Sequence, residues 1–343
     1  MNIVEMVRKH DPENQFKVLV ESYKQIEYAW NNNIDLSSID VKKIKNVIVT
    51  GLGGSAIGGE LFQNYTRAEF KLPYNVNRNY ELPLYANEET LVIASSYSGN
   101  TEETVSALKN SINRNCQIVC ITTGGKLEKI AKENNLPLAI LQQGFQPRYA
   151  LWINFFTLLK IFHNIKLVTD HNDIVEKSID LLKTCGQEYS KQRNKALEIA
   201  ESLIGFIPLV YGVSDYTSAA ATRLKGQFNE NSKLHSFFNN YPELDHNEII
   251  GWESFNQEKV HLKLINLMDD IYNPQIKKRF DITTEIIKKT GCEIIELKSN
   301  QTNFKLRILD IIYLGDWITY YVAILRSYSP TAIDNINYLK EHL

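Results

Sequence analysis

Two loops in the first half of the chain combine residue types that can bind a phosphate group. Residues 51–59 read GLGGSAIGG, which places five glycines among nine positions and adds the hydroxyl of Ser55. Residues 95–101 read SSYSGNT and concentrate hydroxyl side chains. Glycine lets the backbone approach a ligand closely, and neutral amide and hydroxyl donors can hold an anion without bulk positive charge. This chemistry makes the two loops candidates for one phosphate site.

The segments around both loops predict the strands and helices that would position them. An apolar, β-branched run precedes each loop, at 46–50 and from residue 91, and a helical pattern follows each. A third run, QIVCITT at 117–123, ends at Gly124-Gly125 before another helical stretch. Parallel strands joined by helices end at a common edge, where open α/β folds bind ligands. The free amides and the dipole of a helix N-terminus favour phosphate at that edge.

Simpler roles for both loops stay open from the residues alone. The glycine-rich loop could be a tight turn that closes onto a packed helix. Ser98, Asn100 or Thr101 could cap the following helix, as these residue types often do. The spacing matches neither GxxxxGK[ST] nor GxGxxG, so the nucleotide-binding motifs do not apply. Glu102 and Glu103 would repel a phosphate, and we therefore expect both side chains to face outward.

The chain as a whole predicts an α/β protein of two doubly wound domains, each with a mainly parallel sheet flanked by helices. Its 343 residues exceed what one hydrophobic core usually supports. The second half repeats the alternation, with strands predicted at 207–213, 260–267 and 292–298. Residues 147–162 are apolar on nearly all sides and predict a buried helix. We place the boundary at its end. Domain 1–162 then includes an N-terminal helical segment, and domain 163–343 includes a C-terminal helix.

Composition and charge exclude several classes of partner. The chain has 38 Lys and Arg against 40 Asp and Glu, a formal net charge of -2, so no global field draws it to nucleic acid or to an anionic membrane. The first residues contain no apolar signal region, and the run 149–162 is interrupted by Lys160 and too short to span a bilayer. We therefore predict a cytoplasmic protein.

The cysteines predict neither disulfides nor a metal site. Cys116, Cys120, Cys185 and Cys292 form no CxxC pair and have no histidine at zinc-ligand spacing. Reduced thiols buried in strands fit this pattern best. The prediction is a protein without a bound metal.

Six ordered motifs resemble the bifunctional phosphoglucose/phosphomannose isomerase family. They extend from about residue 46 to the C-terminus and read GLGGSAIGGEL, SSYSGNTEET, PRYALW, LKGQFNENSK, PELDHNE and NINYLK. The resemblance implies two sugar-isomerase domains and an aldose–ketose isomerisation through a cis-enediol. Fructose 6-phosphate would be exchanged with glucose 6-phosphate and also with mannose 6-phosphate, without a cofactor.

The resemblance also implies a base and a set of phosphate ligands. The residues that match the family's phosphate ligands are Gly54, Ser55, Ser96, Ser98 and Thr101, which agrees with the analysis of the loops. Glu230 matches the glutamate that moves a proton between C1 and C2, work that suits a carboxylate. From the residues alone, a solvated glutamate at a helix end would be the simpler interpretation.

Three further residues match positions that act on the sugar ring and on the enediolate. His246 matches the histidine that opens the ring; in the family it reaches the site of a neighbouring subunit, which implies a homodimer. Arg148 matches the arginine that stabilises the enediolate. Lys340 matches the lysine that assists at the ring oxygen. Their simpler roles are a helix cap or backbone hydrogen bond for His246 and plain surface exposure for Arg148 and Lys340.

One segment near the C-terminus departs from the family pattern. Ser329-Pro330-Thr331 stands where an acidic residue is expected before the Pro-Thr pair. Because serine also caps helices, we expect the capping function to survive. Thr331 is the nearest match to the small threonine that gives room for either configuration at C2.

Three other functions compete with isomerisation. A phosphosugar-binding regulator without catalysis is the main alternative, but no basic helix-turn-helix segment precedes the first domain. The isomerase half of an amidotransferase would need an attached glutaminase domain, for which Met1-Asn2 leaves no room. A dinucleotide-dependent dehydrogenase is disfavoured because GxGxxG is absent.

Overall fold

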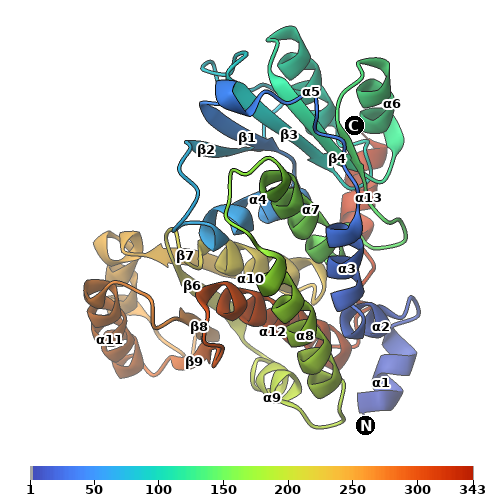
Figure 1. The fold of residues 1–343 in the computed structure, drawn as a ribbon. Helices are drawn as coiled ribbons and strands as arrows, with labels where there is room; N and C mark the ends of the chain where they lie inside the picture. Colours follow the sequence, from blue (N-terminus) through green and yellow to red (C-terminus); the bar gives the residue numbers. More distant parts are fainter. Residues whose placement is uncertain (1–2, 343) are drawn as a thin grey trace. The chain divides into compact units, whose positions relative to one another are not determined.

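A computed structural model describes residues 3–342 and divides them into two compact units. One unit is Ser22–Asp180, and the other combines residues 3–21 with residues 181–342. Each unit contains its own parallel sheet (Figure 1). The predicted α/β fold with two parallel sheets flanked by helices is thereby confirmed. The predicted domains, 1–162 and 163–343, have other boundaries than these compact units. The boundary at residue 162 stays a prediction.

The sheet of Ser22–Asp180 has five parallel strands in the order β2-β1-β3-β4-β5. The strands are β1 (Asn46–Thr50), β2 (Tyr74–Asn77), β3 (Thr90–Ser96), β4 (Gln117–Thr122) and β5 (Leu138–Ile140). The helices are α3 (Tyr23–Asn31), α4 (Gly53–Tyr65), α5 (Glu102–Asn113), α6 (Gly125–Glu133) and α7 (Leu151–Asn164), and α8 (Asn172–Tyr189) begins in this unit. The three runs that precede the polar loops are therefore strands of one parallel sheet, as predicted, and they lie next to one another in it.

Alternation along the strands assigns the helices to opposite faces of this sheet. Ile48, Val92 and Cys120 belong to a buried cluster with residues of α5 and α6. Val49 lies on the other face, where the close approach of α4 requires Gly59: a Cβ there would meet Val49 Cγ1 at 3.1 Å. Helix α7 packs on α4 and has eleven buried residues among its fourteen. The prediction of a buried helix within 147–162 is confirmed.

The sheet of the second unit has four parallel strands in the order β7-β6-β8-β9. The strands are β6 (Ile207–Val213), β7 (Phe237–Tyr241), β8 (Leu262–Met268) and β9 (Glu293–Lys298). The helices are α1 (Ile3–His10), α2 (Gln15–Val20), α9 (Lys195–Ser202), α10 (Ser218–Glu230), α11 (Pro274–Lys289), α12 (Phe304–Leu325) and α13 (Asp334–Glu341). Two 3-10 helices, η3 (Glu243–His246) and η4 (Glu248–Ser254), follow β7.

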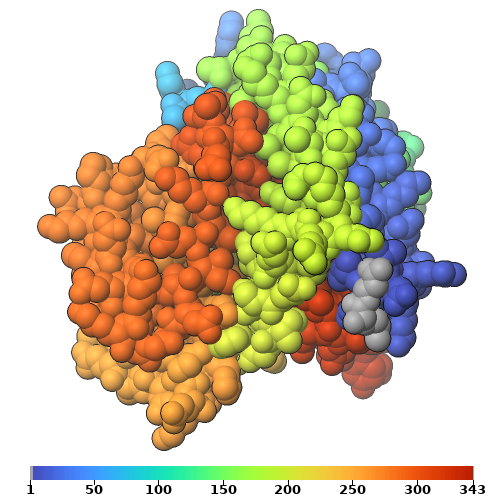
Figure 2. All heavy atoms as spheres, turned by 90° about the horizontal axis from the view of Figure 1, so that it is seen from below, coloured from blue at the N-terminus to red at the C-terminus, as the bar shows by residue number. Residues whose placement is uncertain are grey.

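Helix α12 is the central helix of this unit. By length and composition it could cross a membrane, but 89% of its apolar window is buried inside the protein, as in a core helix. It packs on α9 and α10, and Figure 2 shows α9 (yellow-green) beside its orange-red residues. The N-terminal segment packs on it as well: Tyr320 donates to Asp11 Oδ2 (2.9 Å) and Tyr313 donates to the Leu19 carbonyl (2.6 Å).

All four cysteines are free, as predicted, but their placement differs in part. Cys120 is buried in β4, whereas Cys185 lies in α8 and Cys116 and Cys292 directly precede strands. Burial raises the pKa of Cys120 and of Cys185 to about 12 and that of Cys116 to about 11. These thiols therefore stay protonated near neutral pH and are poor nucleophiles.

Candidate active site

The loops after β1 and β3 lie against each other at the carboxyl edge of the first sheet. A Cβ on Gly51 would meet the Ser95 carbonyl at 2.7 Å and Ser55 Cβ at 3.0 Å, so only glycine allows this approach. Ser55 lies in the first turn of α4 and is 6% exposed. The glycine-rich turn thus brings the N-terminus of α4 beside the second hydroxyl loop.

The hydroxyl groups of the second loop bond to each other rather than to the next helix. Ser96 is buried, and its Oγ lies 2.8 Å from Thr101 Oγ1 and accepts from the Gly99 amide (3.1 Å). Exposed Ser98 accepts from the Asn100 amide (3.3 Å), and Asn100 Oδ1 accepts from the Lys126 amide at the start of α6 (3.1 Å). The suggestion that residue 98, 100 or 101 caps the following helix, α5, with its side chain is therefore wrong, and Asn100 bonds to the first turn of α6 instead.

In the described part of the chain, both helices that begin at this edge, α4 and α5, lack a side-chain cap at their N-terminus. Amides and dipoles of two helix N-termini, with Ser55, Ser96 and Thr101 beside them, form a suitable environment for an anion. Glu102 is exposed and accepts from the Tyr80 phenol (3.4 Å), as expected, whereas Glu103 is half-buried.

A third loop, after β4, supports the second one. A Cβ on Gly99 would meet the Gly124 carbonyl at 1.7 Å, and a Cβ on Gly125 would meet the Ser98 carbonyl at 2.7 Å. Thr123 donates its amide (3.0 Å) and its hydroxyl (2.7 Å) to the Tyr97 carbonyl. The loop that carries Ser96 and Ser98 is thereby fixed in place before any ligand binds.

Replacing Gly99 with alanine is expected to disrupt this loop. The residue has φ +69°, and the new methyl group would overlap the Gly124 carbonyl, so the loop must move. We expect a lower melting temperature and a higher KM for a sugar phosphate. Gly144→Ala is the matched control, because Gly144 has φ +102° in the same unit but no atom within 4 Å of its Cβ position among the described residues. Backbone strain of about 1–3 kcal/mol affects both variants. Equal KM values in the two variants would show that the close approach of Gly99 to the Gly124 carbonyl is not needed for substrate binding.

Arg148 is buried beside the N-terminus of α4. It lies in the 3-10 turn η2 (Pro147–Tyr149) and is 4% exposed, so the alternative of a surface arginine is wrong. A Cβ on Gly54 would meet the Pro147 carbonyl at 2.7 Å and Arg148 Cα at 3.9 Å. The turn is held by Gln25, whose side chain donates to the Tyr149 carbonyl (2.9 Å).

Asn154 is a supporting residue that the sequence analysis missed. It lies on α7, and its Nδ2 donates to Ser95 Oγ at 2.8 Å. Its Oδ1 would be 2.6 Å from a Cβ on Gly58, so α7, α4 and β3 meet at this side chain. An asparagine inside an apolar helix was the available signal, since a buried polar group needs a partner.

Glu230 is the last residue of α10, and its side chain is half-buried. The residues after it are fixed on α12: Asn231 Nδ2 donates to Thr319 Oγ1 (3.2 Å) and Ser232 Oγ donates to the Thr319 carbonyl (2.7 Å). Lys233 donates to the Glu230 carbonyl (2.9 Å). These contacts place the carboxylate on a rigid support rather than on a frayed helix end.

Thr331 is buried and held by hydrogen bonds to Ser329. It is 2% exposed, and its Oγ1 lies 2.9 Å from Ser329 Oγ. The Ser329 hydroxyl accepts from the amides of Thr331 (3.2 Å) and Ala332 (3.4 Å). The expectation that Ser329 caps the last helix is wrong, because α13 begins later, at Asp334, and has no side-chain cap within the described residues. The serine instead closes a local turn around Thr331.

His246 and Lys340 are exposed. His246 ends η3, and its ring makes no hydrogen bond to residues 3–342, so the suggested cap or backbone bond is wrong. Its neighbours are well held: Asp245 accepts from Thr283 Oγ1 (2.8 Å) and Arg279 Nη1 (3.0 Å). Glu248 accepts from Tyr211 and Asn239. Lys340 lies on α13, a helix without buried residues.

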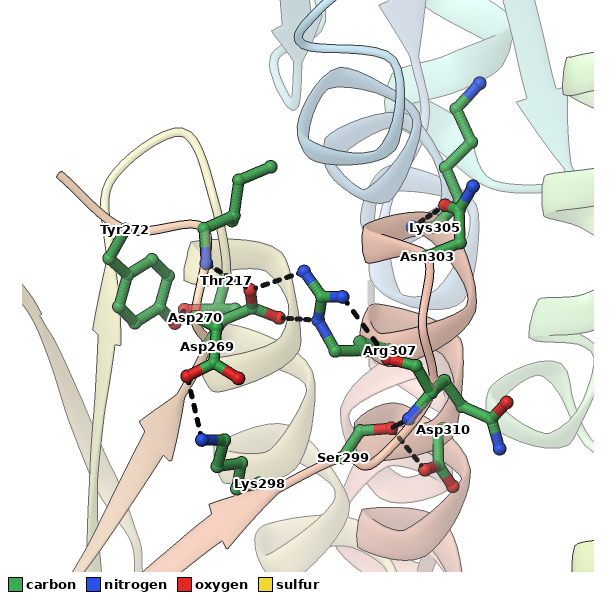
Figure 3. Close-up of polar contacts among 12 residues, drawn as sticks. Thr217, Asp269, Asp270, Tyr272, Lys298, Ser299, Asn303, Lys305, Arg307 and Asp310 are labelled. Carbon is green, nitrogen blue, oxygen red and sulfur yellow. Dashed lines mark hydrogen bonds and ion pairs between the residues drawn. The ribbon is translucent and has the colours of Figure 1, made fainter.

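The carboxyl edge of the second sheet has a different character. Arg307 of α12 points toward Asp269 at the end of β8 (Figure 3), with Nε–Oδ2 2.8 Å and Nη2–Oδ1 2.9 Å. Its remaining nitrogen donates to the carbonyls of Gln301 (3.2 Å) and Thr302 (3.0 Å), and the bond to Asp269 raises the pKa of Arg307. Lys298 pairs with Asp270 (2.8 Å). These charges satisfy one another, so the hydroxyl loops of the first sheet are the better anion site.

The predicted site residues therefore belong to both units. Ser22–Asp180 contains Gly54, Ser55, Ser96, Ser98, Thr101 and Arg148. The second unit contains Glu230, His246, Thr331 and Lys340. Among residues 3–342, no group of three or more His, Cys, Asp and Glu side chains is arranged to hold a metal ion.

Known protein families match segments in both units. Residues 40–144 match the SIS domain family and residues 192–343 match the bacterial phospho-glucose isomerase C-terminal SIS domain. A bifunctional phosphoglucose/phosphomannose isomerase of Caldicellulosiruptor bescii is 36% identical over 96% of this chain and 98% of its own length. A D-glucosamine-6-phosphate 4-epimerase of Sulfolobus acidocaldarius is 33% identical over 66% of this chain and 70% of its own. A crystal structure of a hypothetical protein from Thermus thermophilus shares the fold, with a TM-score of 0.75 at 12% identity over 99% of this chain and 92% of that one.

Proposed function

The chain belongs to the bifunctional phosphoglucose/phosphomannose isomerase family, and we propose that it interconverts fructose 6-phosphate with glucose 6-phosphate and mannose 6-phosphate. It is an aldose–ketose isomerase of sugar phosphates. The observation that supports a phosphorylated substrate is the pair of neutral loops at the carboxyl edge of the first sheet. Ser55, Ser96, Ser98 and Thr101, with the amides of Gly54 and its neighbours, hold the phosphoryl group.

Glu230 is the base in this proposal. It takes a proton from C1 of the open-chain ketose and returns it to C2 of the cis-enediol, while a second proton passes from the oxygen on C1 to the oxygen on C2. The reverse steps convert aldose to ketose. The electrons of the broken C–H bond stay in the substrate, so the exchange needs no external oxidant or reductant. The charge that develops on the enediolate oxygen is stabilised by Arg148, which is buried in the turn that packs against Gly54.

Ring opening and assembly complete the proposal. An exposed imidazole on an anchored turn can reach a second copy of the chain, so His246 opens the ring in the partner's site and the enzyme is a homodimer. Lys340 assists at the ring oxygen, and Thr331 lines the C2 environment. The enzyme acts in the cytoplasm in this proposal, and its net charge of -2 gives no field that would draw it to a membrane or to nucleic acid. The reaction requires no metal or redox cofactor.

The test is an assay of the purified chain with fructose 6-phosphate in the presence and absence of a chelator. We expect both glucose 6-phosphate and mannose 6-phosphate to form, with the same rates in both conditions. A parallel reaction with glucosamine 6-phosphate checks for a change of configuration at C4. Binding of fructose 6-phosphate without turnover would support a regulator, and turnover of glucosamine 6-phosphate alone would support an epimerase. Either result would overturn the proposal, as would loss of activity with the chelator.

A further inference from the structure

The turn after α10 contains a lysine in an unusual backbone conformation. Lys233 has φ +49°, in the left-handed region that glycine usually occupies at helix ends. The amides of Ser232 and Leu234 both donate to the Phe228 carbonyl at 3.1 Å and close the end of the helix. A glycine would adopt this conformation without strain, so what sets Lys233 apart is the set of contacts that its side chain makes.

The ammonium group of Lys233 joins two segments that the proposed reaction needs. It donates to the carbonyls of Glu230 (2.9 Å) and Asn231 (3.2 Å) at the end of α10. It also donates to the Ser329 carbonyl, two residues before Thr331. These three bonds use the full donor capacity of an ammonium group, and the positive charge lies at the negative end of the helix dipole.

The surrounding contacts make this junction rigid. Arg326, at the end of α12, donates to the Ser232 carbonyl. Along the helix, Asp316 accepts from Arg223 (Nε 3.0 Å) and from Gln227 (3.1 Å), both on α10 and both buried. Because α10 is fixed on α12 by buried pairs, a change at Lys233 acts on the helix end and on the Ser329–Thr331 segment rather than on the whole unit.

We propose that Lys233 is a positioning residue that holds the Glu230 end of α10 and the Thr331 segment in one fixed relation, and that this relation sets the ratio of mannose to glucose product. The inference rests on the proposed roles of Glu230 and Thr331. Glucose 6-phosphate and mannose 6-phosphate differ only at C2, and both arise from the same cis-enediol. The face on which C2 receives the proton therefore depends on the position of Glu230 relative to Thr331, the residue proposed to lie beside C2.

Lys233→Gly tests this role, because it removes the ammonium group while allowing the same φ. We expect kcat for fructose 6-phosphate to fall about tenfold or more, since small displacements of a catalytic group are costly. The KM should change less than about twofold because the phosphate loops belong to the other unit, and the mannose-to-glucose product ratio should shift by more than about twofold. A merely structural lysine would not move that ratio.

Lys166→Gly is the matched control. Lys166 also follows a helix, α7, in the left-handed conformation (φ +60°), but its side chain is exposed. We expect this variant to keep the wild-type kcat and product ratio. Lys233→Arg, which retains charged donors, should return the product ratio toward the wild-type value. If Lys233→Gly does not fold, Lys233→Met, which keeps the aliphatic stem, should show the same shift in ratio.

The outcomes separate this inference from the proposed function. If the wild-type chain does not isomerise fructose 6-phosphate, the proposed function fails and the role of Lys233 fails with it. If the wild type is active and neither Lys233→Gly nor Lys233→Met shifts the product ratio, the proposed function stands and only the role of Lys233 is refuted, whether or not kcat falls.

Discussion

Glu230→Gln is expected to lower kcat for fructose 6-phosphate by roughly 10²–10⁴-fold, the usual contribution of a positioned general base. The substitution keeps the size of the side chain and removes only its ability to accept a proton. The KM is expected to stay nearly unchanged, because every proposed phosphate ligand lies in Ser22–Asp180. Steady-state rates and isothermal titration with fructose 6-phosphate measure the two effects separately.

Glu201→Gln provides the control for this variant. Glu201 lies in the last turn of α9 in the same unit and is exposed, so the same chemical change is made away from the candidate site. It should retain wild-type kcat and KM. Turnover by Glu230→Gln at the wild-type rate would rule out the glutamate as the base. A loss of binding with no loss of kcat would assign it to substrate recognition instead.

Arg148→Met is expected to reduce kcat by roughly 10²–10³-fold, the usual cost of removing one donor to a developing oxyanion. The guanidinium is buried and the turn that carries it packs on Gly54, so water cannot readily replace it. Arg148→Lys should not restore the rate, because an ammonium group lacks the planar donor geometry of a guanidinium. Single-turnover measurements of the isomerisation step would test both expectations.

Arg78→Met is a suitable comparison in the same unit. Arg78 pairs with Glu60 at 2.7 Å with 41% of its side chain exposed, and a pair of this kind contributes about 0–1 kcal/mol to stability. Its removal should leave kcat unchanged. If Arg148→Met lowers the melting temperature strongly but keeps the wild-type kcat, the arginine supports the fold and has no part in the chemistry.

The sheets could be predicted from the sequence wherever local signals were strong. The runs at 46–50 and 117–122 are apolar or β-branched and border glycine-rich turns, and both are strands of the first sheet. Strand β7, residues 237–241, was missed because its sequence FFNNY contains two asparagines, which are poor strand formers. Its register is imposed by pairing with β6, which no local pattern records.

The residues of the candidate site could be predicted from the sequence, but the hydrogen bonds between them could not. Residue types and motifs identified the hydroxyl loops, whereas the bond between Ser96 and Thr101 depends on the path of the loop. Surface exposure was the simpler alternative for Arg148, and a helix cap was the expectation for Ser329. Both are wrong, because burial and hydrogen-bond partners are decided by tertiary contacts. The hydrogen bond from Lys233 to Ser329 joins residues far apart in the chain, and the sequence around neither residue predicts it.

The attachment of residues 3–21 to α12 has a consequence for synthesis on the ribosome. Helices α1 and α2 emerge first, yet the helix on which they pack begins at Phe304, roughly 280 residues later. At about 5–20 residues per second, these first helices wait on the order of 15–60 s for their partner. Ser22–Asp180 is finished during that interval. The nascent chain thus passes through a stage in which its phosphate loops can already be folded, but α12, which supports the helix that carries Glu230, has not yet been synthesised.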